Sequence, residues 1–211
     1  MTEQEIWDAL EMGEDLDWLY TQQTLSPEQI NKALEIGEDL DILYRFHNLS
    51  PEQIDRALEI GKDLDRLYQN QTLSPEQIDK ALDMGKKLRW LYREQKLSPE
   101  QIDRVLEIGD FLDYIYINQT LSPEQVSKAL EIGEWLDYLY KYQILSPEQV
   151  DIALEIGEEL DQLYEYQTIP FVLKKKQLPE EYQSKEYKTE TTTNLEDFLV
   201  RLKKYIQNKG E

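Results

Sequence analysis

The sequence predicts an all-α protein, a right-handed α-solenoid of seven 24-residue helix-turn-helix repeats. Three observations predict this class. The hexapeptide LSPEQI, or LSPEQV in its last two copies, occurs six times at a constant spacing of 24 residues. Apolar residues recur at helical spacing after each copy, and a glycine follows at a fixed position. Because a unit of this size cannot bury its apolar face alone, the units must stack on one another.

The repeats cover residues 1–24, 25–48, 49–72, 73–96, 97–120, 121–144 and 145–168, and we number the positions within each repeat from 1 to 24. The hexapeptide starts the first helix. In the second repeat, Ser26 can cap the helix, Pro27 takes the first helical position, and Gln29 completes a capping box. In the first repeat, Thr2 and Glu5 can do the same.

The glycine at position 13 has two possible roles. Inside a helix, each glycine would cost about 1 kcal/mol relative to alanine, so either a left-handed turn ends the helix there or glycine permits close contact along one long helix. The acidic residues that follow at once, Glu38–Asp41 in the second repeat, are typical of a helix N-terminus. Two helices per unit also give every repeat the same environment. We therefore predict a second helix, with Leu40, Leu43 and Tyr44 facing inward.

The predicted solenoid spans residues 1–168. The composition then changes, and residues 169–193 are predicted to form an end cap and a polar linker. Residues 194–208 are predicted to form an amphipathic helix. This helix could fold back on the acidic repeats through Arg201, Lys203 and Lys204, self-associate, or dock on a partner.

The segment LSPEQIDKAL, residues 73–82, is similar to the first-helix opening of transcription-activator-like effector repeats, and the stacked helix pairs resemble tetratricopeptide-type solenoids. The resemblance covers about ten residues per unit and implies a superhelical stack of helix pairs. It does not imply DNA reading, because those families use 34-residue units and the effector's pair of base-reading residues and basic inner surface have no counterpart here.

Composition narrows the function. The formal charge is −21, from 44 acidic and 23 basic residues, which disfavours direct binding of nucleic acid and favours a basic protein partner. There is no cysteine, no signal-peptide pattern and no long apolar run, so we expect a cytoplasmic protein that does not bind membranes. The sequence contains no nucleophile–base pair, phosphate loop or histidine–carboxylate cluster, so we expect no enzymatic activity, cofactor or metal.

Repeat positions 15, 18 and 22 form a stripe beside the predicted core of the second helix. Aromatic residues gather there in the fifth and sixth repeats, and rings beside carboxylates are typical of protein-binding surfaces. Alternatively, the rings fill gaps between repeats. The candidate partner-binding residues are Trp90, Phe111, Tyr114, Trp135, Tyr138, Tyr142 and Tyr166.

Charge also differs between repeats. The net charges are −7, −3, −2, +2, −4, −2 and −7 in chain order. The positive fourth repeat suggests an anion site, although its cations could instead pair with neighbouring carboxylates. The candidate anion-binding residues are Lys86, Lys87, Arg89 and Arg93. Position 17 holds a ladder of aspartates that could contact a basic partner or favour the helix N-termini: Asp17, Asp41, Asp65, Asp113, Asp137 and Asp161.

These features predict an interaction module that binds a basic or amphipathic protein. One alternative is a DNA mimic, the class to which several viral inhibitors of nucleic-acid enzymes belong. With repeats advancing by about 9 Å, the array would carry roughly one net charge per 3 Å, against one per ~1.7 Å in duplex DNA. The positive fourth repeat weakens this alternative. A binder of a nucleotide or small signalling ligand is a further alternative.

Overall fold

A computed structural model describes residues 1–167 of the chain. These residues contain fourteen α-helices and no strand, and the helices pair in a regular repeat, which confirms the predicted α-solenoid class. The end cap, linker and final helix predicted for residues 169–208 lie outside the described part. The helices are α1 (Glu3–Met12), α2 (Leu16–Gln22), α3 (Pro27–Ile36), α4 (Leu40–Phe46), α5 (Pro51–Ile60), α6 (Leu64–Asn70), α7 (Pro75–Met84), α8 (Leu88–Glu94), α9 (Pro99–Ile108), α10 (Leu112–Asn118), α11 (Pro123–Ile132), α12 (Leu136–Tyr142), α13 (Pro147–Ile156) and α14 (Leu160–Tyr166).

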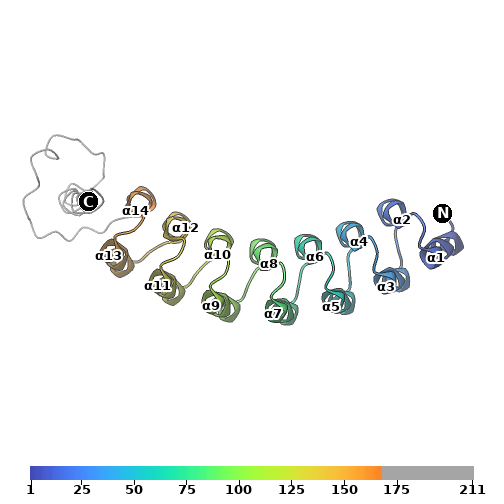
Figure 1. Cartoon of the computed structure of the whole chain (residues 1–211), viewed down its shortest axis with the longest axis horizontal. Coiled ribbons are helices and arrows are strands. Elements are labelled where there is room, and N and C mark those ends of the chain that lie inside the picture. The colour runs from blue at the N-terminus through green and yellow to red at the C-terminus, as the bar shows by residue number, and fades with distance from the viewer. Residues whose placement is uncertain (168–211) are drawn as a thin grey trace, which may run out of the picture. The chain divides into compact units, whose positions relative to one another are not determined.

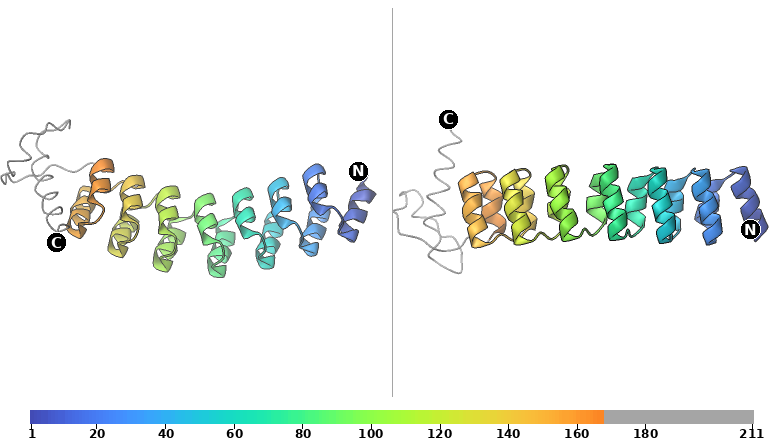
Figure 2. Two further views of the ribbon diagram at one scale, coloured as in Figure 1. Left: turned by 45° about the horizontal axis from the view of Figure 1, so that its top comes forward. Right: turned by 90° about the horizontal axis from the view of Figure 1, so that it is seen from below.

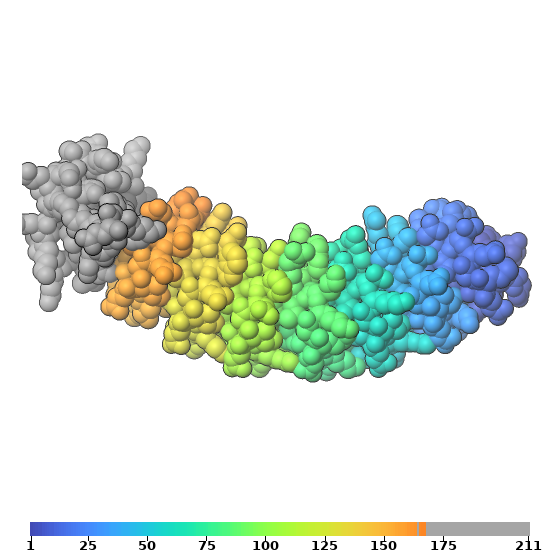
Figure 3. Space-filling model, in the orientation of Figure 1, coloured from blue at the N-terminus to red at the C-terminus, as the bar shows by residue number. Residues whose placement is uncertain are grey.

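The chain forms two compact units, Met1–Arg104 and Val105–Glu211. In the first unit, α2, α4, α6 and α8 form one layer and α1, α3, α5 and α7 a second layer (Figure 1). In the second unit, α10, α12 and α14 form one layer, and α11 packs on α13 in the other. Within a unit, the helices of one layer run side by side (Figure 2), and consecutive repeats touch along the visible face (Figure 3).

The predicted start and end of the first helix in each repeat are confirmed. The Ser26 hydroxyl accepts a hydrogen bond from the Gln29 amide N–H (3.3 Å), and the Gln29 side chain accepts one from the Ser26 N–H (2.8 Å). Thr2 and Glu5 form the same capping box at α1. The seven glycines at position 13 have φ between 63° and 79° and end the first helix of each repeat. The alternative of one long helix per repeat is therefore wrong.

Position 15 differs from the sequence-based prediction, which placed it on the second helix. It precedes that helix and also has a left-handed backbone, with φ of 49° to 56° in the seven repeats. The two residues between Gly13 and Leu16 must redirect the chain, and a second left-handed residue does this. Aspartate tolerates the conformation in the first three repeats, but Phe111 and Trp135 are bulky residues for which it is strained.

The core of each unit is shared between repeats. Leucines at positions 10, 16 and 19 and tyrosines at position 20 are buried in almost every described repeat, as predicted for Leu40, Leu43 and Tyr44. No single repeat encloses these side chains, so the core forms only when neighbouring repeats stack.

A buried glutamine at position 23 links successive repeats. Nε2 of Gln71 donates to the carbonyl oxygens of Tyr44 (2.7 Å) and His47 (2.8 Å) in the preceding repeat, and Oε1 accepts from the Leu49 N–H (3.0 Å). Gln143 makes the equivalent three hydrogen bonds in the second unit. The glutamine therefore satisfies backbone groups where two repeats join.

His47 takes the place of this glutamine in the second repeat. Its Nε2 lies 2.9 Å from the Tyr20 carbonyl oxygen, so that nitrogen carries the proton and donates. Burial lowers the pKa of the His47 imidazole, although the hydrogen bond to Tyr20 opposes the shift. The imidazole therefore stays neutral in the folded protein at neutral pH.

A second glutamine ladder runs through the other layer. The Gln53 side chain closes its own capping box and also donates to the Pro27 carbonyl oxygen (2.9 Å) and to Oδ1 of Asn31 (3.0 Å) in the preceding repeat. Gln77 donates to Pro51 in the same way (2.8 Å). Each layer thus has its own polar link between repeats.

The position-20 tyrosines of the first six repeats are fully buried, and several of their hydroxyl groups have no hydrogen-bond partner. This holds for Tyr20, Tyr44, Tyr68, Tyr116 and Tyr140. Burial raises the pKa of the Tyr68 phenol to about 12. These hydroxyls lose hydration without compensation, which destabilises the fold.

We expect His47→Gln to raise the free energy of unfolding by about 1 kcal/mol at about pH 7.5, because glutamine can bond Tyr20 and also the loop groups that Gln71 bonds one repeat later. The difference in free energy of unfolding between the variant and the original protein should increase toward about pH 5.5. The unfolded histidine takes up a proton below its ordinary pKa of 6.5, whereas the folded one resists, so only the original protein loses this stability as pH falls. Urea unfolding of both proteins across this range tests this. A gap that stays constant or narrows would contradict it.

We expect Tyr68→Phe to leave the free energy of unfolding unchanged or to raise it by up to about 1 kcal/mol, because the ring keeps its packing and the buried unpaired hydroxyl is removed. Thermal and urea unfolding measure the change. Tyr68→Ala is the matched control and should cost roughly 3–5 kcal/mol through the cavity that it leaves. A substantial loss of stability with phenylalanine would mean that the hydroxyl is satisfied.

Candidate functional site

Four aromatic residues of the second unit lie together on α12, on α14 and just before α12. We call Trp135, Tyr138, Tyr142 and Tyr166 the aromatic surface. Trp135 is 50% exposed, Tyr142 and Tyr166 are exposed to a similar degree, and Tyr138 is half-buried between repeats. Trp135, Tyr142 and Tyr166 are therefore exposed as a binding surface requires. The half-buried Tyr138 fits the alternative that a ring fills a gap between repeats.

Ring contacts hold this surface in place. The Trp135 and Tyr138 centroids are 5.9 Å apart with an edge-on geometry, and Tyr138 stacks on Tyr142 at 6.3 Å with an interplanar angle of 16°. The Lys141 ammonium lies 5.3 Å from the Tyr142 centroid and 5.5 Å from the Tyr166 centroid of the next repeat. These distances are typical of aromatic and cation–π interactions.

The surroundings are acidic. Glu134, Glu158, Glu159 and Asp161 are exposed on the same two repeats. The Glu165 carboxylate accepts a hydrogen bond from the Tyr166 phenol, which raises the pKa of that phenol. Charge interactions with the Tyr142 and Tyr166 phenol groups, and with Glu165, raise the pKa of Lys141. The aromatic surface thus presents rings next to exposed carboxylates.

The remaining candidate rings differ in exposure. Phe111 is exposed and lies in the strained turn before α10, whereas Trp90 and Tyr114 are half-buried. The structure therefore brings together four of the seven predicted residues. Trp90 belongs to the first unit and is described with it.

The fourth repeat places its cations against rings and carboxylates. The Arg89 and Arg93 guanidinium groups lie 5.2 and 5.3 Å from the Trp90 ring centroid. Nε of Arg93 also lies 3.2 Å from a Glu94 oxygen. Nζ of Lys87 is 4.0 Å from an Asp65 oxygen. The Lys87–Asp65 contact joins adjoining repeats, as the alternative to an anion site predicts, whereas Arg93 and Glu94 belong to the same repeat.

Lys86 follows the pattern of the repeat before it. Nζ of Lys62 donates to the Gly37 carbonyl oxygen at the end of α3 (2.9 Å), and the Lys86 ammonium lies close to Gly61 at the end of α5. Cations at helix C-termini are stabilising. Lys86 thus has a structural role available in addition to the predicted anion site.

Carboxylates of successive repeats influence one another in the first unit. The pKa of Asp39 is raised, first by burial and then by the charges of Asp17 and Asp41. Burial and the charges of Asp41 and Asp65 raise the pKa of Asp63, against Lys62 and Lys87. Aspartates at positions 15 and 17 of neighbouring repeats therefore lie close enough for their charges to interact.

Metal binding and membrane crossing find no support in residues 1–167. Within that range, no group of three or more histidine, cysteine, aspartate or glutamate side chains is placed to hold a metal ion. No helix in the same range is long and apolar enough to cross a bilayer. Comparison with known proteins gives no matching family, no similar curated protein and no similar solved structure.

Two features of the candidate surfaces were not predicted from the sequence. Lys141 is not a candidate in the sequence analysis, because its contact with Tyr166 joins residues 25 positions apart in different repeats. Trp18 occupies position 18 of the predicted stripe but is not among the candidate residues, although it is 50% exposed. A signal was present in the first repeat, where several residues differ from the repeat pattern.

We expect Phe111→Asn to raise the free energy of unfolding by about 1 kcal/mol, because asparagine adopts the left-handed conformation more readily than phenylalanine does. Urea unfolding measures the change. Phe111→Ala is the control, since it removes the same exposed ring but keeps the strain of a β-carbon at this φ. Equal effects of the two substitutions would contradict the strain at this position.

Proposed function

We propose that the protein is a non-enzymatic interaction module whose aromatic surface binds a basic or amphipathic segment of a partner protein. The observation that carries this proposal is the position of Lys141 between the Tyr142 and Tyr166 rings. These rings already accept a cation from the chain itself. Trp135 and Tyr138 extend the same surface with further ring area.

Energetics support aromatic residues as the anchors. A cation over an exposed ring contributes about 0.5–1 kcal/mol, and more when the pair is desolvated. Exposed carboxylates contribute less individually, because water and salt screen them. Clusters of tyrosine and tryptophan are the usual centres of binding energy in protein interfaces.

The acidic surroundings would favour a basic partner. The seventh repeat has a net charge of −7 and the sixth −2. Such a field speeds the association of a positively charged segment and weakens as salt is added. Strained Trp135 fits this function, because a residue that costs backbone energy is better explained by what its side chain contacts.

A DNA mimic is the second candidate, and the carboxylate ladder of the first unit favours it. Burial, and then the charges of nearby aspartates, raise the pKa values of Asp39 and Asp63, so negative charges lie close together there, as along a phosphate backbone. Lys86, Lys87 and Arg89 interrupt this ladder in the fourth repeat. A partner recognised this way would be a nucleic-acid-binding enzyme.

Affinity capture with the immobilised full chain tests the proposal. We expect wild-type protein to retain a basic protein from cell extract, and Trp135→Ala combined with Tyr138→Ala to weaken binding at least tenfold, the effect of losing a central anchor. The recovered partner is identified by mass spectrometry, and its affinity for each variant is measured by titration calorimetry.

The control is Glu3→Ala combined with Glu11→Ala, which removes two exposed charges and leaves every ring. It should change the affinity less than the ring variant does. Equal or reversed effects would mean a purely electrostatic mechanism. Release of the partner by competing duplex DNA would identify a mimic instead.

A further inference from the structure

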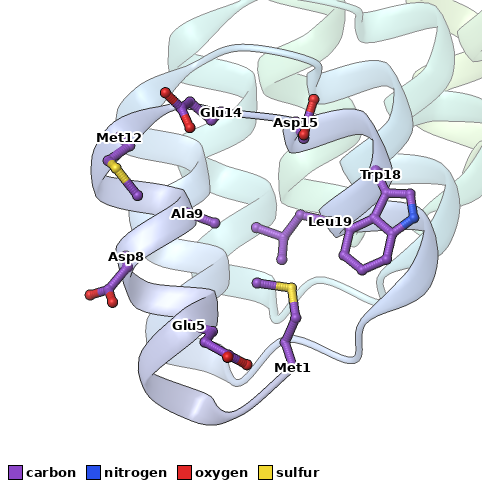
Figure 4. Close-up of a pocket in the computed structure, with 9 residues that line it drawn as sticks. All are labelled: Met1, Glu5, Asp8, Ala9, Met12, Glu14, Asp15, Trp18 and Leu19. Carbon is purple, nitrogen blue, oxygen red and sulfur yellow. The ribbon is translucent and has the colours of Figure 1, made fainter.

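The first unit carries a groove between α1 and α2, whereas the aromatic surface belongs to the second unit. Its volume is about 340 Å³. Met1, Leu19 and Trp18 face the opening from one side and the residues of α1 from the other (Figure 4). The full lining is Met1, Glu5, Asp8, Ala9, Met12, Glu14, Asp15, Trp18 and Leu19.

The apolar part of this groove corresponds to a surface that is buried in the later repeats. Ala33 and Ala57, the equivalents of Ala9 in repeats that follow another repeat, are completely buried, whereas Ala9 is half-buried. Met12 is 64% exposed and Trp18 50% exposed. The first repeat thus leaves open a face of the kind on which a helix pair packs in the rest of the unit.

The charged side chains of the lining are all acidic. Glu5, Asp8, Glu14 and Asp15 line the groove, and no lysine or arginine does. Hydrogen bonds from Thr2 lower the pKa of Glu5, which keeps its carboxylate ionised. The Met1 ammonium group donates to Gln23 (3.4 Å). A basic occupant would therefore be complementary.

A second copy stacked end to end would not be complementary. In later repeats, a cation at position 8 pairs with the acid at position 11 of the preceding repeat, as Arg56 does with Glu35 (3.4 Å). Lys128 and Glu107 repeat this pairing in the second unit (3.1 Å). The first repeat has Asp8 at this position, which would face the acidic Glu155 of another copy's last repeat.

The residue at position 5 of the first repeat also disfavours stacking of a second copy. Gln53 donates through Nε2 to the carbonyl oxygen of Pro27 in the preceding repeat. Glu5 replaces this glutamine and has only acceptor oxygens when ionised. The face thus keeps the apolar shape of a junction between repeats but lacks the donor and the cation that such a junction uses.

We propose that this groove is a second docking site, and that it binds a basic amphipathic helix of a partner protein. Apolar side chains of the helix pack against Trp18 and Met12, and its lysines or arginines face Asp8 and Glu14. A helix fits because helices occupy the equivalent surface elsewhere in the unit. The site is independent of the proposed aromatic surface, which lies in the other unit.

Fluorine NMR on the full chain tests the proposal. The four tryptophans are labelled with 5-fluorotryptophan, and each signal is assigned by a Trp→Phe variant. The probe is a short amphipathic helical peptide of leucine and lysine. We expect the Trp18 signal to shift on titration, whereas a lysine–glutamine peptide of equal charge and a leucine–glutamate peptide should not move it. An equal shift with the lysine–glutamine peptide would overturn the proposal, since it needs no apolar contact.

Asp8→Lys combined with Glu14→Lys supplies the matched variant, because later repeats carry Lys32 and Lys62 at these positions. We expect it to weaken the binding seen at Trp18 at least fivefold, a typical effect of reversing charges at an interface rim. Glu59→Lys combined with Glu131→Lys makes the same change in net charge elsewhere and should weaken it less. Equal weakening by the two pairs would overturn the proposal.

Two further measurements test other occupants. A Trp18 signal that depends on protein concentration would identify a second copy. A Trp18 signal that moves without peptide when Arg201, Lys203 and Lys204 are changed to glutamate would identify the chain's own C-terminal segment. Either result would overturn the proposal. The Trp135 signal reports separately on the aromatic surface, so failure of one proposed site is distinguishable from failure of the other.

Discussion

The hydrogen bonds of the position-23 glutamine are the constraint on which each unit depends. Where one repeat joins the next, the loop carries backbone carbonyls and an N–H into an apolar interior that water does not reach, and leaving them unpaired would be costly. Gln71 satisfies two carbonyl oxygens and one N–H at once. Because those carbonyls belong to the preceding repeat, the same bonds fix the distance between neighbours. The position-5 glutamines do this for the other layer.

Different positions of the repeat build the core and form the surface, which explains why some of them can vary. Positions 10, 16, 19, 20 and 23 build the core and its polar links, so the residues at positions 15, 18, 21 and 22 are free to differ between repeats. The first unit places aspartates at position 15 of its first three repeats, and Lys87 and the cations around Trp90 follow in the fourth. The second unit places rings and Lys141 there. Since the core holds these side chains in fixed relative positions, this protein would lose less ordering entropy when a partner binds.

The repeat pattern predicted the local structure well because its causes are local. A serine, proline and glutamine at fixed spacing define a helix start, and glycine defines the end. Contacts between repeats were harder to predict. The period shows that Tyr142 and Tyr166 lie one repeat apart, but not that Lys141 reaches both rings, because that depends on the offset between adjacent helices. The turn at position 15 was missed because its aspartates, followed by leucine and another acid, also fit the first turn of a helix.

The exposed ion pairs between repeats show which position can change with little loss of stability. The ion pairs between position 8 and the preceding repeat are exposed, and such pairs contribute about 0–1 kcal/mol each. They complement the buried glutamines and the shared core but cannot replace them. A change at position 8 therefore costs little stability, and the first and last repeats do differ there, with Asp8 and the partly exposed Ile152. Asp8 makes the open face of the first repeat unlike any junction between repeats. Position 8 can thus change with little loss of stability, and the residue there determines what the open face of the first repeat can bind.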